Sequence, residues 1–380
     1  MPFALVNARV LLAQGLCEGL AVNVADGRIL SVTDDPLAGA SIVDCDGDML
    51  LPGFIDTQVN GGGGVLFNDR PAVETIATIA AAHRRFGTTG LLPTLISDSL
   101  DVVAAGIAAV DAAIEQGVPG ILGIHIEGPF LSQARRGVHD GARLRTLDRA
   151  AIDLLTSARH GRTLVTLAPE CVQPGDIAAL VDAGVIVAAG HSDADYETVR
   201  RAIDEGLTGF THLFNAMSPL TSRAPGMVGA ALESGDVFAG LIVDGCHVHP
   251  AAARVALRAK GHERLMLVTD AMALTDGGVD RFLLQGREIA RVGKRLVDAD
   301  GTLAGSTLTM GQAVRNMVGQ VGADFGQAVA MASASPAAFL GIGDRIGAIA
   351  PGLSADLVLM DDDWQIRRSW IMGSSEPAPH

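Results

Sequence analysis

Seven acidic or histidine side chains lie where apolar segments of the chain end. They are Asp56, Glu127, Glu170, His191, His212, His247 and Asp270. In a barrel of parallel strands the carboxyl ends of all strands meet at one mouth, where barrel enzymes place their catalytic residues. A carboxylate and several imidazoles converging there suit a divalent metal such as Zn²⁺, which accepts nitrogen and oxygen ligands and keeps one position for water. The pattern therefore predicts a metal site at one end of a barrel.

A single histidine at a strand end is more often a hydrogen-bonded surface or core residue than a metal ligand. Repetition favours the metal site here, because Glu127, His191 and His212 occupy equivalent positions in successive or nearly successive units. His125 precedes Glu127 by two residues, so we expect it one layer deeper, where it supports the site. The role of His249, beside Pro250, stays open. The remaining histidines are expected to be solvated: His83, His160, His262 and His380.

The elements that must position these residues alternate between apolar segments and helical patterns. The apolar segments span residues 53–60, 89–97, 121–128, 163–170, 185–192, 208–215, 238–247 and 265–271. Helical patterns occupy residues 71–86, 101–116, 147–159, 176–183, 196–205 and 250–260. Eight such units predict an α/β fold of the closed (β/α)₈ TIM-like type. A doubly wound sheet has the same local pattern, and only the number of units favours the barrel.

The two ends of the chain have a different pattern. Short β-branched runs before residue 52 are separated by turns at Asp26-Gly27 and Asp46-Gly47, which predicts a small antiparallel β module. The tail repeats this pattern in ADLVLM, residues 355–360. We therefore expect a small β-sandwich domain formed from residues 1–52 and 345–380, and a barrel domain of residues 53–344. The turn-rich segment 281–301 predicts a hairpin inserted after the eighth barrel strand.

Composition narrows the class of protein. The 380 residues are 48% hydrophobic and 19% charged, which suits a large core and excludes a disordered chain. With 28 basic and 43 acidic residues the net charge is −15, which disfavours nucleic acid or an anionic membrane as a partner. Four scattered cysteines, and an N-terminus without a signal-peptide pattern, predict a cytoplasmic protein.

Six short motifs together resemble a known family. They are PGFIDTQVNGGGG (52–64), HIEGPFL (125–131), GHSDA (190–194), THLFNAM (211–217), DGCHVHP (244–250) and VTDAM (268–272). In this order and at these spacings they are similar to the amidohydrolase superfamily, and within it to the N-acetylglucosamine-6-phosphate deacetylase family. The resemblance implies deacetylation of N-acetyl-D-glucosamine 6-phosphate to glucosamine 6-phosphate and acetate, in amino-sugar catabolism and cell-wall sugar recycling.

The resemblance also implies roles for individual residues. Glu127, His191 and His212 would bind one divalent metal, with Zn²⁺ or Fe²⁺ as candidates. Asp270 would be the catalytic acid and base, taking a proton from the attacking water and passing it to the departing amine. His139 would polarise the carbonyl or orient the sugar. The expected substrate-binding residues are Val138, Asn215, Ala216, Arg223, His247, Leu303, Ala304 and Gly305.

Arg223 aligns with the family's phosphate-binding arginine, which often reaches in from a partner subunit, so a homodimer is implied. Two positions depart from the pattern. The superfamily usually has His-x-His after PGFID, whereas Gln58 and Asn60 stand here. Neutral amides are poor transition-metal ligands, which predicts one tightly held metal. Ala224 replaces a glutamate that often follows the arginine, which affects the phosphate clamp.

Two alternatives to this function are open. The same chemistry on N-acetylgalactosamine 6-phosphate, or on another N-acyl substrate, is compatible with the motifs, because no single residue distinguishes the sugar epimers. The second alternative is a barrel that has lost catalysis and serves as a scaffold or binding protein. That hypothesis requires a broken ligand set or a missing Asp270, and neither occurs here.

Overall fold

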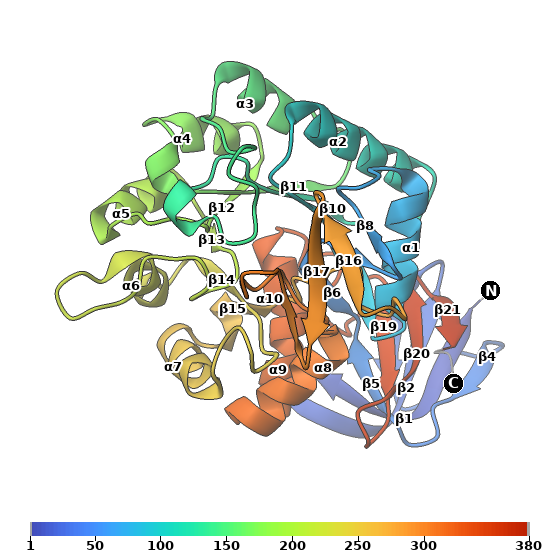
Figure 1. Cartoon of the computed structure of the whole chain (residues 1–380). Helices are drawn as coiled ribbons and strands as arrows, with labels where there is room; N and C mark the ends of the chain where they lie inside the picture. Colours follow the sequence, from blue (N-terminus) through green and yellow to red (C-terminus); the bar gives the residue numbers. More distant parts are fainter. Residues whose placement is uncertain (1, 378–380) are drawn as a thin grey trace.

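The computed structural model describes residues 2–377. A sheet of eight parallel strands forms the centre of the molecule (Figure 1). The strands follow chain order around the sheet: β6 (Phe54–Val59), β9 (Thr88–Ile96), β10 (Gly123–Glu127), β11 (Arg162–Leu167), β12 (Ile186–Ala189), β13 (Gly209–Phe210), β14 (Phe238–Leu241) and β15 (Leu265–Leu267). The segment after β15 closes the sheet onto β6, because Val59 bridges Ala271 and Asp270 N donates to Gln58 O at 3.0 Å. The barrel prediction is confirmed, and the doubly wound sheet is excluded.

Helices cover the outside of the barrel. They are α1 (Val73–Arg84), α2 (Leu100–Glu115), α3 (Arg149–Leu155), α4 (Asp176–Asp182), α5 (Tyr196–Asp204), α6 (Gly226–Glu233), α7 (Pro250–Lys260), α8 (Met310–Asn316), α9 (Phe325–Ala332) and α10 (Ala334–Phe339). Short helical turns lie at Gln133–Arg135, Pro169–Cys171, His262–Arg264 and Met317–Val321. All six predicted helices are present. No helix in residues 2–377 is long and apolar enough to cross a membrane.

Local signals explain several helix starts. The side chains of Ser99, Asp148 and Asp195 each accept a backbone N–H at the start of the following helix. His249 does the same for Ala251 N, with Pro250 in the first turn, so this open position is an exposed helix cap. Sequence reasoning missed α6, since GMVGAALE is buried over most of its length and has almost no polar face to reveal a helical period.

Both chain ends join in one further sheet. It contains β1 (Phe3–Leu12), β2 (Gly15–Ala25), β3 (Arg28–Thr33), β4 (Ser41–Asp44), β5 (Met49–Pro52), β19 (Leu357–Met360), β20 (Ile366–Ile371) and β21 (Ser374–Pro377). Antiparallel pairing of β5 with β19 unites the two ends, as predicted. The purely antiparallel prediction is wrong, because β1 pairs in parallel with both β4 and β5. β5 leads directly into β6, so this sheet anchors the first barrel strand.

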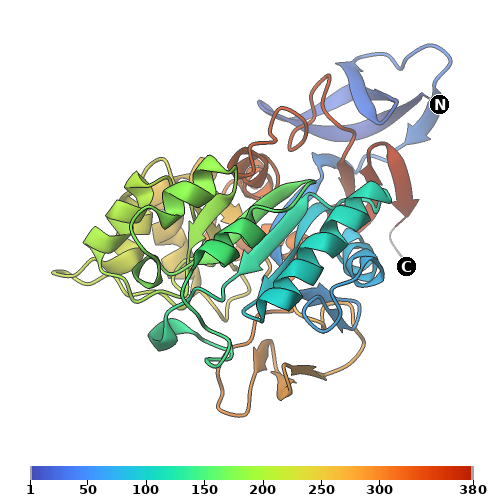
Figure 2. The same cartoon turned by 90° about the horizontal axis from the view of Figure 1, so that it is seen from above.

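A three-stranded antiparallel sheet follows the eighth barrel strand, in the segment where a hairpin was predicted. Its strands are β16 (Arg281–Leu284), β17 (Arg287–Val292) and β18 (Arg295–Val297). A two-stranded ribbon, β7 (Gly61–Gly62) and β8 (Val65–Leu66), follows β6. Figure 2 shows the β16–β18 sheet on the opposite side of the barrel from the sheet of the chain ends.

Candidate active site

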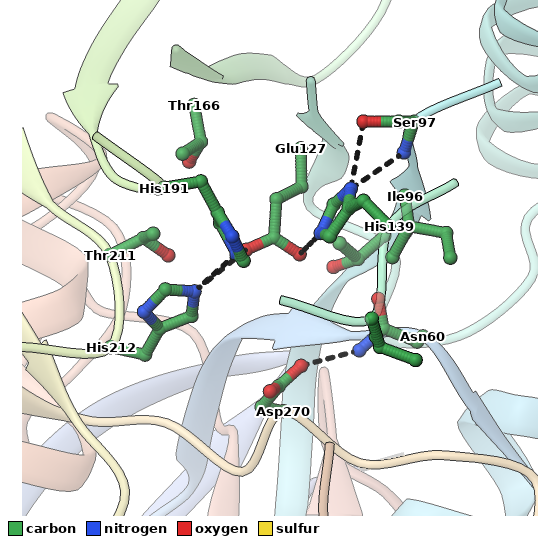
Figure 3. A network of polar contacts seen from close by, with 12 residues as sticks. Asn60, Ile96, Ser97, Glu127, His139, Thr166, His191, Thr211, His212 and Asp270 are labelled. Atoms are coloured by element: carbon green, nitrogen blue, oxygen red, sulfur yellow. Dashed lines mark hydrogen bonds and ion pairs between the residues drawn. The ribbon is translucent and has the colours of Figure 1, made fainter. Parts of the chain in front are cut away.

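Three side chains from the ends of β10, β12 and β13 meet at one point. Glu127 ends β10, His191 lies two residues after β12, and His212 lies two residues after β13. His212 Nε2 lies 3.0 Å from Glu127 Oε1 and 2.9 Å from His191 Nε2, and His191 Nε2 lies 3.3 Å from Glu127 Oε1 (Figure 3). Ligands of a tetrahedral metal at bond lengths of about 2.0–2.1 Å stand about 3.3 Å apart. The three atoms therefore fit the ligand set of one metal ion.

Hydrogen bonds set the ring orientation of His191. Its Nδ1 lies 3.0 Å from the carbonyl oxygen of Arg135, which can only accept, so Nδ1 carries the proton and Nε2 presents a lone pair. Burial opposes ionisation of Glu127, but the neighbouring imidazoles of His191 and His212 hold its pKa well below the usual value. Burial likewise opposes the charged form of His212, and Glu127 nevertheless raises its pKa. This attraction brings an anionic carboxylate and two imidazoles together.

His139 also lies near this centre, since single atoms of Glu127, His139 and His191 lie within 4.8 Å of one another. Its Nδ1 accepts from Ser97 N at 3.3 Å and lies 2.7 Å from Ser97 Oγ. A backbone N–H can only donate, so Nδ1 is unprotonated and Nε2 carries the proton, 4.0 Å from Glu127 Oε2. Burial lowers the pKa of His139 well below the usual value and keeps the ring neutral. His139 is therefore placed as a hydrogen-bond donor through Nε2. His212 fits the third ligand position better than His139, because its Nε2 lies closer to the Glu127 carboxylate.

The strand ends turn sharply to bring these groups inward. His191, His212 and Asp270 have φ values of 48°, 27° and 50°, in the left-handed region that residues other than glycine seldom adopt. Such conformations cost free energy and persist where the surrounding structure enforces them. The three residues sit at three different strand ends, so the strain is concentrated at the mouth of the barrel.

Two amide side chains join Asp270 to the ligand set. Asn60 Nδ2 donates to Asp270 Oδ1 at 2.6 Å. Gln58 Nε2 donates to Glu127 Oε1 at 2.9 Å and reaches Asp270 Oδ1 at 3.4 Å, while Gln58 Oε1 accepts from Thr211 Oγ1 at 2.8 Å. Burial, together with the charge of Glu127, raises the pKa of Asp270 to about 6. The sequence predicted that these amides are not metal ligands, and their hydrogen bonds to the two carboxylates were not foreseen.

One cavity is lined by five of the seven strand-end residues but not by Asp56 and Glu170. Asp56 is fully buried and accepts from Thr269 Oγ1 at 2.5 Å and Gln58 N at 3.2 Å, which ties β6 to the segment after β15. Burial raises the pKa of Asp56 to about 7. Glu170 accepts from Ser192 Oγ and Asp193 N, both at 2.6 Å, and so holds the loop that carries His191. Both residues shape the site from outside it.

Glu127, His191 and His212 open into a cavity of about 350 Å³. Most of the expected residues line it: Glu127, Val138, His139, His191, His212, Asn215, Ala216, His247, Asp270, Leu303 and Gly305. Asp244 Oδ2 lies 2.7 Å from His247 Nδ1 and orients that ring. Two expected residues do not line the cavity. Ala304 is fully buried beside it, and Arg223 is exposed on the loop before α6, which projects away from the barrel (Figure 1).

The cavity also contains residues that sequence reasoning missed. They are Ile96, Ala134, Arg135, Gly137, Ile242, Met272 and Thr302, and Asn60, which the sequence placed at one of the two departing positions, lines the cavity as well. Arg135 is paired with Asp193 at 2.8 Å. Arg135 and Gly137 lie in the sequence RRGVHD (135–140), where only Val138 and His139 were expected to belong to the site.

The other histidines have structural surroundings. His125 is buried between Thr166 Oγ1 at 2.8 Å and Thr94 Oγ1 at 3.4 Å, on the strands that flank β10. Burial lowers its pKa to about 4, so this deeper layer is neutral. His83 was expected to be solvated, and this is wrong: it is fully buried, and its Nε2 lies 2.9 Å from Gly61 O. His160 and His262 are at least partly accessible, and His380 lies outside the described residues.

The sequence and the fold of this chain are similar to those of known proteins. Residues 49–377 match the model of the amidohydrolase family. The chain is 46% identical to a protein of Shewanella sp. (strain ANA-3) named N-acetylgalactosamine-6-phosphate deacetylase, covering 97% of this chain and 94% of that protein. The structure of N-acetylglucosamine-6-phosphate deacetylase from Pasteurella multocida superposes with a TM-score of 0.96 at 33% identity, covering 99% of this chain and 100% of that one.

A third relative has been solved with a ligand. It is a mutant N-acetyl-D-glucosamine-6-phosphate deacetylase from Mycobacterium smegmatis, in complex with N-acetyl-D-glucosamine-6-phosphate. Its TM-score is 0.89 at 34% identity, and the match covers 98% of this chain and 99% of that one. The match to the family model over residues 49–377, together with the shared barrel, shows that this chain belongs to the amidohydrolase family.

Proposed function

We propose that this chain hydrolyses the acetamide of N-acetyl-D-glucosamine 6-phosphate in the cytoplasm, releasing D-glucosamine 6-phosphate and acetate. The observation that carries the proposal is the convergence of Glu127, His191 and His212 beside Asp270 in one cavity. The relative solved with N-acetyl-D-glucosamine-6-phosphate supports the choice of substrate. This reaction belongs to amino-sugar catabolism and cell-wall sugar recycling. An intact ligand set argues against the scaffold alternative.

Glu127, His191 and His212 would hold one divalent ion, because a buried carboxylate and two imidazole nitrogens match the donors that Zn²⁺ prefers. Fe²⁺ accepts the same donors. Such an ion supplies Lewis-acid polarisation of the carbonyl and lowers the pKa of a coordinated water. Gln58 keeps the Glu127 carboxylate oriented through its 2.9 Å hydrogen bond.

Asp270 would transfer the proton. Its carboxylate lines the cavity, and Asn60 holds Oδ1 at 2.6 Å, which leaves Oδ2 free to take a proton from the attacking water. Water adds to the acetamide carbon, and the bond from that carbon to the sugar nitrogen then breaks. Asp270 returns the proton to the departing nitrogen, so acetate and the free amine leave and the carboxylate is regenerated.

His139 would stabilise the oxygen of the acetamide as negative charge develops on it. The Nε2–H of a neutral imidazole, fixed by Ser97 on the opposite side of the ring, is a preorganised donor of the kind that oxyanion sites use. We assign sugar recognition to Val138, His247, the Asn215-Ala216 segment and the segment Leu303–Gly305. Ala304 acts there only through its position between two cavity-lining neighbours.

The phosphate of the proposed substrate requires a cationic partner. Within residues 2–377, Arg135 is the one arginine that lines the cavity, and Asp193 already pairs with it. Arg223 is exposed on a loop outside its own cavity, where a guanidinium could bind the phosphate of a neighbouring subunit bidentately. We therefore propose a homodimer in which Arg223 crosses the interface.

A second candidate is the same hydrolysis on N-acetyl-D-galactosamine 6-phosphate. It is favoured by one observation, the 46% identity to a relative that carries that name. The two sugars differ only in the orientation of one hydroxyl. Measuring kcat/KM for both sugar phosphates on the same preparation separates the two candidates, because the preferred epimer will have the larger value.

The first experiment compares wild type with Asp270→Asn and with Asp300→Asn, which changes an exposed loop residue. We expect about one metal ion per chain in all three proteins. Acetate release should fall by a factor of about 10³ or more in Asp270→Asn alone. Full activity in Asp270→Asn would contradict the proposal that Asp270 transfers the proton. Metal binding without turnover of either sugar phosphate would indicate a different amide substrate.

A further inference from the structure

The β16–β18 sheet backs one wall of the active-site cavity. Its buried face presents Leu284, Ile289 and Leu296, all of them at most 1% exposed. These side chains belong to one apolar cluster with Ile96, Val138 and Met272, which line the cavity. The sheet is therefore packed against Val138, the residue directly before His139, and against two further residues of the cavity lining, although it contributes no residue to the cavity itself.

The turn between β16 and β17 carries a polar side chain, Gln285, that contacts the barrel. Leu284 pairs with Arg287, so the turn consists of Gln285 and Gly286 alone, with φ values of 50° and 83°. Two positive φ values in a two-residue hairpin turn favour Asn or Asp followed by glycine, so a glutamine at the first position is unusual. A strained residue of this kind invites a functional explanation.

Gln285 is held by two acceptors at the end of β9. Its Nε2 donates to Ser97 O at 2.8 Å and to Asp98 Oδ2 at 3.1 Å. Both partners can only accept, which fixes the orientation of the amide. Asp98 is itself buried and also accepts from Arg143 at 2.8 Å, so the hairpin turn is bound to a buried carboxylate that a second side chain holds in place.

Arg287, the first residue after the turn, contacts the loop that carries His139. Arg287 donates from its guanidinium to Val138 O. That carbonyl belongs to the peptide group whose N–H is the backbone N–H of His139. Ser97, the partner of Gln285, holds Nδ1 of the same histidine through its N–H and Oγ (Figure 3). Two side chains of one hairpin thus hold both the backbone of His139 and the residue that orients its ring.

We propose that Gln285 and Arg287 are positioning residues for His139, which fix the direction in which its Nε2–H points into the cavity. This inference rests on the proposed function of His139 as a donor to the acetamide oxygen. The value of such a donor depends on its direction, because a displacement of about 1 Å can lower a catalytic rate by up to about a hundredfold. The hairpin acts on the reaction through this histidine and touches no reacting atom.

The test measures acetate release by Gln285→Ala and Arg287→Ala, with Arg281→Ala as the matched control. Arg281 lies on the same hairpin, and its ion pair is with Glu288 of the same hairpin at 3.3 Å. We expect kcat to fall on the order of tenfold in the two tip variants, with KM, metal content and thermal stability close to the control. Arg287→Lys should restore most of kcat, because it supplies a donor to Val138 O.

The decisive step repeats Gln285→Ala in a His139→Ala background. If the tip acts through His139, the second substitution has no further effect on kcat; an equal further loss overturns the proposal, as does a wild-type kcat in both tip variants.

The nitrogen NMR signals of His139 give a readout without substrate, and they should change in Gln285→Ala but not in Arg281→Ala. An inactive wild type in which these signals still change would reject the proposed function and leave the positioning role standing. Unchanged signals would reject the positioning role.

Discussion

In the proposed mechanism Asp270 takes up and releases a proton within one reaction, so its pKa sets the range of pH in which it can act. Burial and the charge of Glu127 raise that pKa to about 6, whereas the hydrogen bond from Asn60 lowers it. The side-chain amides of Asn60 and Gln58, which donate to the Asp270 carboxylate, therefore favour its ionised form. The ionised form is the one that accepts a proton from water.

Asn60→Ala tests this consequence. Removing the donor at 2.6 Å destabilises the ionised carboxylate, so the pKa of Asp270 rises and the acidic limb of kcat/KM moves to higher pH. A hydrogen bond to a charged group predicts a shift on the order of one pH unit. His160→Ala, which removes a surface contact with Glu115, should leave the limb unchanged. A limb that stays in place in Asn60→Ala would contradict this role.

Asp56 makes stability depend on pH. Its folded-state pKa of about 7 lies above the ordinary value of 3.8, so between these pH values the folded state binds more protons than the unfolded state. The free energy of unfolding therefore decreases as pH rises through this window. Asp56→Asn mimics the protonated carboxyl and accepts the same backbone N–H groups.

Urea unfolding at pH 5 and pH 7.5 checks this prediction. The variant should match wild type at the lower pH and exceed it at the higher pH. Asp300→Asn, on an exposed loop, serves as the reference. A wild type that gains stability over Asp56→Asn as the pH rises would show that the sign is wrong.

Among the elements, the barrel strands were the most predictable, because each is a short apolar run that ends in a polar residue. All eight apolar segments contain a strand, although only two residues of the segment 208–215 form β13. The helix α6 was missed for lack of a polar face, and the parallel pairing of β1 was missed because alternation does not encode strand direction. Hydrogen bonds between distant segments, such as Gln58 with Glu127, leave no local pattern at all.

The spacing of the barrel strands sets the distance between the proposed metal ligands. Gly190, directly before His191, lies where an added Cβ would approach Thr211 Cγ2 to 2.3 Å and Thr166 Cγ2 to 3.0 Å. These are branched side chains on adjacent strands and cannot swing aside. A side chain at this position must therefore separate β12 from Thr211 and His212.

Gly190→Ala is expected to destabilise the protein by about 1–3 kcal/mol and to weaken metal binding. Metal content after dialysis against a chelator, together with the melting temperature, measures both effects. Gly235→Ala is the matched control, because an added Cβ there meets nothing within 4 Å and the residue is exposed. Equal metal retention in the two variants would show that strand spacing does not control the ligand set.

At the scale of the whole molecule, the chain folds into a barrel whose mouth holds the proposed metal ligands and Asp270, and the one arginine that lines the cavity within residues 2–377 is already paired with Asp193. The sequence motifs alone predict the ligands and much of the cavity wall, because each motif surrounds one strand end. They do not reveal that Arg223 lies outside its own cavity, since that depends on how a loop leaves the barrel. A net charge of −15 makes a specific cation for the substrate phosphate more important, since the overall field repels an anionic substrate.

Subunit complementation tests whether a partner supplies this cation. Arg223→Ala and Asp270→Asn are each expected to be nearly inactive at low substrate concentration. In a mixed dimer one site combines both lesions, whereas the other has an intact Asp270 and receives Arg223 from the partner. Random exchange of subunits would restore about one quarter of all sites. If Arg223 instead served its own cavity, every site in the mixed dimer would carry one lesion. The recovered kcat/KM after unfolding and refolding the two variants together therefore distinguishes the two arrangements, with variants refolded separately as the reference.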